Sequence, residues 1–280
     1  MGQAHNEHHF IPAFMLRQWE RGEDSKLTTM TWRNGAVRLG RNRAKAVAKW
    51  TQLYTLHDAP EHAKNIIESK VFQKVDDEGA IAHAAILGGG LPCLSDELAQ
   101  CWTRFVVALL MRSPWFIQEQ VKKAPRVMLD TILKTALPEE DTAATLQAIL
   151  SANPNFATTI ALRSLVSLLP NSQSHAAIQG ARWALADLRA SPIDLVIGDL
   201  PVLRTAGGFE GDFMLAFPIA PKTLFIVHPE NSTWAPRLGT LSARDLVRRA
   251  NIDSASQAID YVFATSSAHI QLAKRYLRRR

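Results

Sequence analysis

A run of cations with aromatic residues among them, near the start of the chain, is the clearest set of side chains suited to chemistry. Between Ser25 and His57 there are seven Lys and Arg residues and no Asp or Glu. The cations are Lys26, Arg33, Arg38, Arg41, Arg43, Lys45 and Lys49, and Trp32, Trp50 and Tyr54 lie among them. Cations neutralise phosphates and aromatic rings stack on bases, so segment 33–49 predicts contact with nucleic acid. The alternative is a solvated hairpin and loop whose aromatic side chains face the core.

The formal charge of +6 is unevenly distributed along the 280 residues. Five further cations fall in the last seven residues, and the rest of the chain is net negative. A basic C-terminus of this kind is typical of a frayed, soluble end, so residues 270–280 are expected to form a flexible basic tail.

Common signatures of catalysis and targeting are missing from the sequence. No phosphate loop, dinucleotide fingerprint, zinc-ligand spacing or nucleophile elbow is present, and Cys93 and Cys101 cannot build a disulfide framework. The longest apolar run, 105–111, is far below the roughly 20 residues of a bilayer-spanning helix. With 47% hydrophobic and 21% charged residues, the chain is expected to be a globular cytoplasmic protein with no membrane partner.

The basic segment must be positioned by a β-hairpin. Asn34-Gly35 separates two β-like runs, 27–32 and 36–39, and supplies the positive φ angles of a type I′ turn. Upstream, Pro12 suits the first turn of a short helix that Gly22 ends.

Helical patterns follow over the middle of the chain. Apolar residues recur every four residues over 60–79, with Asp58 as a plausible N-cap, and a strongly apolar helix begins at Ser95 and stops at Pro114. Breaks are expected at Pro125, Pro138 and Asn153-Pro154, and surface loops near Gly88 and Pro170.

Beyond Ala190 the pattern changes to short β-like runs at 193–199, 202–205, 213–217 and 223–228, followed by two helices at about 242–250 and 254–263. Strands and helices that segregate in this way favour an antiparallel sheet. We therefore expect an α+β fold in one domain, residues 1–280, with an N-terminal β-hairpin, a central helical core and C-terminal antiparallel strands closed by helices.

Motifs that run almost from end to end resemble a large bacterial family known as domain of unknown function 4238. They are His8-His9-Phe10-Ile11-Pro12-Ala13-Phe14-Met15-Leu16-Arg17, Leu53-Tyr54, Ile67-Glu68-Ser69, Leu110-Met111-Arg112-Ser113-Pro114, Ile197-Gly198-Asp199-Leu200-Pro201-Val202, Phe217-Pro218-Ile219-Ala220-Pro221, and Asn251 with Tyr261-Val262-Phe263-Ala264. The resemblance points to candidate site residues and implies no reaction.

The polar residues that these motifs bring forward are His8, His9, Glu68, Arg112, Asp199 and Asn251. Together they suggest a site for a divalent metal, Mg²⁺ or Mn²⁺, and a phosphate. Glu68 and Asp199 would be metal ligands, His9 a third ligand or general base, and Arg112 the clamp on developing phosphorane charge. In an extended chain the side chains of His8 and His9 point to opposite sides, so only one of them could act as metal ligand or general base.

Each of these residues also has a structural interpretation. Arg112 could pair with Glu68 or Asp199 inside the protein, Asp199 could form a turn before Leu-Pro, and Asn251 could end a helix. The histidines could cap the Pro12 helix or lie in a loose terminus.

Two functions remain open at this point. One is a metal-assisted phosphodiesterase that acts on nucleic acid or a nucleotide, with His9, Glu68, Arg112 and Asp199 at its centre. The other is a non-catalytic module that binds nucleic acid or protein, serving bacterial defence or stress response, in which the same polar residues form an internal network.

Overall fold

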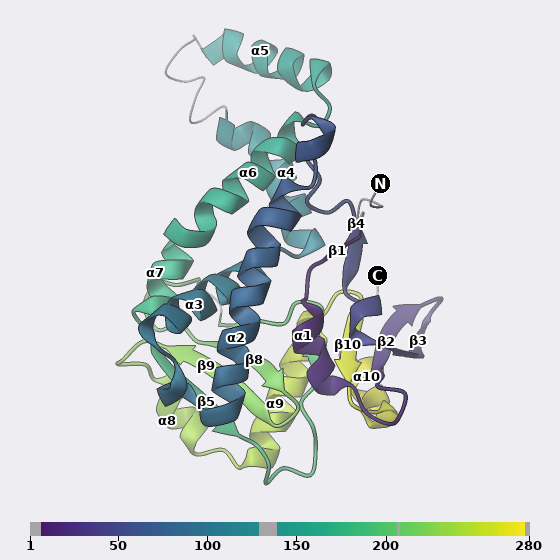
Figure 1. Ribbon diagram of the computed structural model, residues 1–280, viewed down its shortest axis with the longest axis vertical. Helices are drawn as coiled ribbons and strands as arrows, with labels where there is room; N and C mark the ends of the chain where they lie inside the picture. The colour runs from purple at the N-terminus through teal and green to yellow at the C-terminus, as the bar shows by residue number, and fades with distance from the viewer. Residues whose placement is uncertain (1–6, 129–138, 206–207, 278–280) are drawn as a thin grey trace.

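Two four-stranded antiparallel sheets, with helices packed around them, dominate the computed structural model, which describes residues 7–128, 139–205 and 208–277 (Figure 1). The strands are β1 (Glu7–His9), β2 (Leu27–Arg33), β3 (Ala36–Asn42), β4 (Lys49–Thr51), β5 (Arg182–Asp187), β6 (Ile197–Gly198), β7 (Leu203–Arg204), β8 (Leu215–Ala220), β9 (Thr223–His228) and β10 (Tyr261–Ala264). The helices are α1 (Ala13–Leu16), α2 (Gln73–Gly89), α3 (Asp96–Met111), α4 (Pro114–Met128), α5 (Glu139–Ala152), α6 (Phe156–Asn171), α7 (Gln173–Gln179), α8 (Trp234–Gly239), α9 (Ala243–Gln257) and α10 (Ile270–Tyr276). The expected α+β class is confirmed.

The first sheet has the strand order β3-β2-β10-β6 and contains the predicted hairpin. Asn34 and Gly35 have φ angles of 51° and 75°, as a type I′ turn requires, and Arg33 pairs with Ala36 beside the turn. β10, from the far end of the chain, lies antiparallel to β2, with Tyr261 opposite Thr31. The sheet thus joins the N-terminal and C-terminal parts of the chain.

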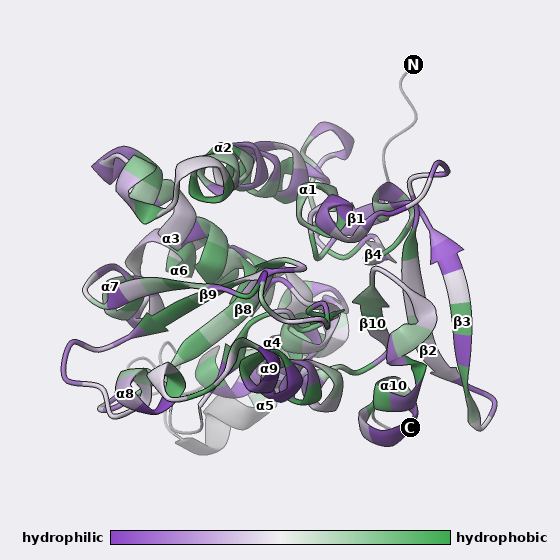
Figure 2. Cartoon of the chain, turned by 90° about the horizontal axis from the view of Figure 1, so that it is seen from below, coloured by the Kyte–Doolittle hydropathy of each residue, from purple (hydrophilic) through white to green (hydrophobic). Residues whose placement is uncertain are grey.

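The second sheet has the order β5-β9-β8-β7 and is covered by helices on both faces (Figure 2). Phe217 of β8 and Phe225 of β9 pack into the core with α3, whereas Ala216 and Ile226 pack against α9. This alternation follows the two-residue period of a strand and accounts for the near-continuous apolar sequence of β8 and β9.

The predicted central helix is confirmed as α3, and it forms the centre of the core. Ser95 caps it by accepting a hydrogen bond from the Leu98 amide at 3.2 Å. Trp102 and Phe105 on this helix are fully buried, and the Trp102 ring lies 5.8 Å from the Phe217 ring of the second sheet.

Several expected helix boundaries are wrong. The two helices expected at 242–250 and 254–263 are instead one helix, α9, followed by strand β10. The apolar run at 261–264 forms a strand because it pairs with β2. Pro125 and Pro170 lie inside α4 and α6. Asp58 does not cap a helix; its carboxylate accepts hydrogen bonds from Asn155 and Thr159. The break at Pro138 lies outside the described residues.

The segment expected to be a flexible basic tail is ordered as far as Leu277. It forms α10, whose Ala273 and Leu277 are buried with Met30 of β2 and Val262 of β10. Residues 278–280 lie outside the described part of the chain. Among the described residues, no helix combines the length and apolarity that crossing a bilayer requires.

Candidate nucleic-acid interface and buried charge cluster

The polar face of the β2–β3 hairpin forms one wall of a groove. Thr29, Thr31 and Arg33 alternate along β2, and Arg38 stands opposite Thr31 on β3. Because alternate side chains share a face, these residues point to the same side of the sheet. The chain at 46–49 and Glu7 form the other wall, and the groove has a volume of about 540 Å³.

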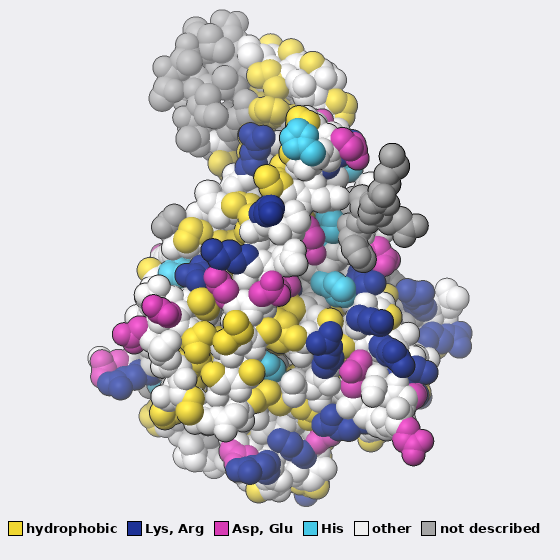
Figure 3. All heavy atoms as spheres, in the orientation of Figure 1, with side chains coloured by type: hydrophobic (Ala, Val, Ile, Leu, Met, Phe, Trp, Pro, Cys, Tyr) yellow, Lys and Arg dark blue, Asp and Glu magenta, His cyan; other side chains and the backbone are white. Residues whose placement is uncertain are grey.

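Three of the six predicted phosphate-binding cations line this groove: Arg33, Arg38 and Lys49. Arg33 donates to the Tyr261 hydroxyl at 3.3 Å, and Lys49 pairs with Glu7 at 3.0 Å. Arg38 has no ion-pair partner within the described ranges. Basic side chains gather on this side of the molecule, over the hairpin (Figure 3).

The other three predicted cations lie outside the groove. Arg41 is held by Asp24, with 2.7 Å between the guanidinium and the carboxylate. Arg43 and Lys45 are exposed on the chain that follows β3. The structure therefore brings together only half of the cations that the sequence pattern grouped.

A smaller pocket of about 230 Å³ continues from the groove. It is lined by Phe10, Thr31, Trp32, Arg33, Lys49, Trp50, Trp115, Asp260 and Tyr261. Thr31, Arg33, Lys49 and Tyr261 also line the groove, so the two hollows are contiguous. Trp50 is 40% exposed, and its ring meets the Trp115 ring edge to face at 6.5 Å. An aromatic, cation-rimmed pocket of this kind can hold a base whose phosphate lies in the groove.

On the other side of Phe10 lies a buried charge cluster centred on Arg112. The Arg112 side chain is fully buried; its Nε donates to the Phe10 carbonyl at 2.9 Å, and its Nη1 donates to Asp76 at 2.6 Å. The Tyr54 hydroxyl donates to the Arg112 carbonyl at 2.7 Å. The guanidinium also lies over the Phe72 ring, 5.6 Å from its centroid. These contacts fix Arg112 in one orientation.

Glu68 belongs to the same cluster and lies in a π-helical turn, Ile67–Phe72, that leads into α2. Burial raises the pKa of Glu68 to about 7, opposed by the charge of Arg112 and reinforced by that of Asp76. Its Oε2 and the Nη2 of Arg112 are buried without a hydrogen-bond partner among the described residues. A carboxyl group that titrates near neutrality can give or take a proton.

The two histidines lie on β1 and, as expected for extended chain, differ in their surroundings. His8 is buried, its Nδ1 accepts from the Tyr54 amide at 2.9 Å, and its ring stacks on the Tyr54 ring. His9 is half-buried, with Nε2 placed 3.3 Å from the Lys45 carbonyl. Burial and the charge of Lys49 lower the pKa of His9 to about 4, so the ring is neutral at pH 7.

Asp199 is placed apart from this cluster, in contacts of its own. Its two carboxylate oxygens accept hydrogen bonds from the backbone amides of Ile259, Asp260 and Tyr261, at 2.8, 2.6 and 2.9 Å. Burial raises the pKa of Asp199 to about 6 against the lowering effect of these three donors. The carboxylate thus fastens the turn between α9 and β10.

Asn251 is likewise used within the fold. Its side-chain carbonyl accepts from the Val196 amide at 2.8 Å, and its amide donates to the Asp194 carbonyl at 2.9 Å. This pair of bonds fastens the chain before β6 to α9.

The predicted site residues are therefore only partly brought together. Glu68 lies close enough to Arg112 to feel its charge, and Tyr54 joins His8 to Arg112, whereas Asp199 and Asn251 bond elsewhere. Within the described ranges, no group of three or more His, Cys, Asp or Glu side chains is arranged to hold a metal ion. The acid beside Arg112 is Asp76, which the sequence reasoning missed, although it lies eight residues after Glu68, a spacing that returns to the same side of a helix.

In a comparison with protein-family models, residues 7–268 match the family described as "Protein of unknown function (DUF4238)". No curated protein and no solved structure matches the chain.

Proposed function

Since the chain belongs to the DUF4238 family of proteins of unknown function, we propose from its geometry alone that it binds single-stranded nucleic acid. The observation that carries the proposal is the continuity of a cation-lined groove with an aromatic pocket through Arg33 and Lys49. The groove would neutralise backbone phosphates while the pocket takes one base. Bases in a duplex are stacked inside the helix, so a pocket that takes one base favours a single strand.

Binding without cleavage fits the geometry better than a phosphodiesterase does. Metal-assisted cleavage would need Glu68 and Asp199 to share a Mg²⁺ or Mn²⁺ ion. The oxygens of Asp199 are instead occupied by three backbone amides, and Arg112 is closed in by Asp76 and the Phe10 carbonyl. The cluster behind Phe10 then supports the pocket from inside the protein.

The charge contribution can be tested with a matched pair of variants. Arg33→Gln combined with Arg38→Gln removes two groove cations, and Arg41→Gln removes a hairpin cation that Asp24 already holds. In fluorescence anisotropy with a labelled single-stranded oligonucleotide, we expect the double variant to lose at least about tenfold in affinity. The slope of log affinity against log salt should become shallower by about 1.4, or about 0.7 per lost phosphate contact.

Three outcomes would contradict this proposal. Arg41→Gln could weaken binding as much as the double variant does, the wild-type protein could prefer a duplex of the same sequence, or the wild-type protein could bind neither the single strand nor the duplex.

The variant Trp50→Ala separates the contribution of base stacking from that of charge. It should weaken binding about tenfold at an unchanged salt slope, because base stacking on an aromatic ring contributes about 1–3 kcal/mol.

A further inference from the structure

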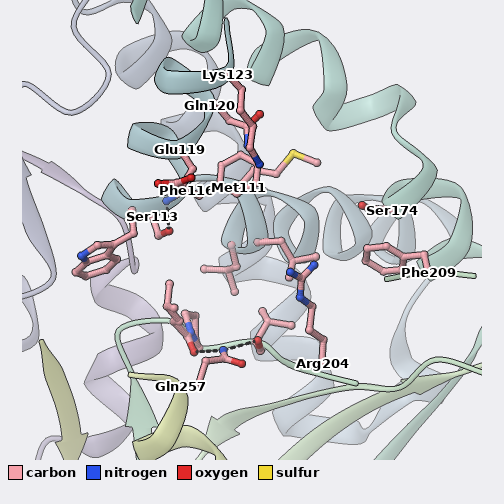
Figure 4. Close-up of a pocket in the computed structure, with 16 residues that line it drawn as sticks. Met111, Ser113, Phe116, Glu119, Gln120, Lys123, Ser174, Arg204, Phe209 and Gln257 are labelled. Carbon is pink, nitrogen blue, oxygen red and sulfur yellow. Dashed lines mark hydrogen bonds between the residues drawn. The ribbon is translucent and has the colours of Figure 1, made fainter. Parts of the chain in front are cut away.

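A second hollow, separate from the groove, lies between α4 and the chain that connects β6 to β7 (Figure 4). Its volume is about 470 Å³, within the usual range for a site that encloses a small organic molecule. Trp115 lines both this hollow and the aromatic pocket.

The inner surface of this hollow is mostly apolar. It is supplied by the end of α3, the first turn of α4 and the β6–β7 connection, through Leu109, Leu110, Met111, Phe116, Leu200 and Val202, and by Phe209 of the chain between β7 and β8. The connection is held in place by Gln257, whose amide donates to the carbonyls of Leu200 and Val202 at 2.9 and 2.8 Å (Figure 4). Hydrogen bonds within the protein therefore hold this wall in place.

Two cations extend into the hollow from opposite walls. Lys123 reaches from α4 and Arg204 from β7, and their charged ends point toward one another (Figure 4). Neither has an ion-pair partner among the residues described. Glu119, which also lines the hollow, pairs with Lys122 at 2.7 Å. An anion between them would interact favourably with both positive charges.

From the apolar lining and the two facing cations, we propose that this hollow binds a small organic acid with an apolar body and a carboxylate group. The body contacts the apolar surface formed by α3 and α4, and the carboxylate accepts hydrogen bonds from the Arg204 guanidinium and the Lys123 ammonium. Charged donors of this kind give a carboxylate an advantage over a neutral or cationic molecule of the same shape.

The proposal is tested by isothermal titration calorimetry with three probes that share one body: phenylbutyrate, phenylbutanol and phenylbutylamine. Wild-type protein should bind the acid in preference to the alcohol and the amine. Lys123→Gln and Arg204→Gln should each weaken acid binding about tenfold, since each removes a charged hydrogen-bond donor to the carboxylate. Arg126→Gln, which removes an exposed cation of α4 outside the hollow, should leave it unchanged.

Three results would overturn the assignment: no binding of the acid by wild-type protein, equal binding of the amine, or an equal loss in Arg126→Gln. Lys123 and Arg204 are exposed, so their variants are expected to fold, and circular dichroism verifies this. Oligonucleotide binding should be unaffected by Lys123→Gln, which keeps this result distinct from the test of the groove.

Discussion

Glu68 and Asp76 share a single buried cation. Arg112 donates directly to Asp76, whereas the Oε2 of Glu68 has no hydrogen-bond partner among the described residues. Burial raises the pKa of both acids, that of Glu68 to about 7, and the charge of Arg112 opposes this effect. Glu68 is thus the member of the cluster whose ionisation near neutral pH costs the folded state free energy.

This arrangement predicts a specific dependence of stability on pH. The pKa of Glu68 is about 7 in the folded state and 4.5 in its ordinary surroundings, so the folded protein binds more protons between these values. The free energy of unfolding contributed by Glu68 therefore falls as pH rises from about 5 to 7. At about pH 8, Glu68→Gln should be more stable than wild type by about 2 kcal/mol, and the two should converge at acid pH.

Chemical denaturation at several pH values measures this effect. Burial lowers the pKa of His9, His83 and His269, so these residues also make stability depend on pH, and the quantity to compare is the difference between variant and wild type. Glu61→Gln, on an exposed turn, is the matched control and should follow the wild-type profile. A Glu68→Gln variant with the wild-type profile would mean that the ionisation of this carboxyl does not affect folding.

At the scale of elements, the turn from α9 to β10 depends on a side chain from another part of the chain. The carboxylate of Asp199 satisfies three consecutive backbone amides, at positions 259–261, as the chain leaves the helix and enters the strand. Buried amides without partners are costly, so this carboxylate makes the turn possible.

Asp199→Asn should therefore destabilise the protein by about 2 kcal/mol, because the amide group of Asn has one accepting oxygen and faces a backbone donor with its own N–H. Hydrogen exchange at Ile259, Asp260 and Tyr261 should accelerate. Asp253→Asn, which removes an exposed partner of Arg249, should have little effect. Unchanged amide hydrogen exchange in Asp199→Asn would show that the turn is stable without the Asp199 carboxylate.

Elements with strong local signals could be predicted from the sequence, and those set by distant partners could not. Asn34-Gly35 and Ser95 determine their turn and helix start through backbone geometry and capping, which are local. The run 261–264 fits a helix or a strand equally well until β2 lies beside it. For the candidate site, the sequence pattern predicted the groove cations Arg33, Arg38 and Lys49. Tertiary packing alone brings Trp115 to the aromatic pocket and Asp76 to the buried charge cluster.

At the scale of the whole molecule, both sheets contribute to one hydrophobic core. Phe263 of the first sheet and Phe217 of the second belong to the same buried cluster as Trp102 of α3. We therefore expect the two sheets to unfold together. Hydrogen exchange measured at increasing denaturant should give β2 and β8 the same free energy of opening; a lower value for β2 and β10 would indicate a separately folding unit.

The position of β10 has a consequence for how the protein is made. During synthesis the hairpin leaves the ribosome early, but β10, which pairs with the other edge of β2, emerges only after residue 261 has been made. Until then the backbone groups of one edge of β2 lack their strand partner, and such an edge can pair with other chains. Nascent chains should therefore depend on rapid completion or on chaperones to protect that edge, and a premature stop before residue 261 removes the strand altogether.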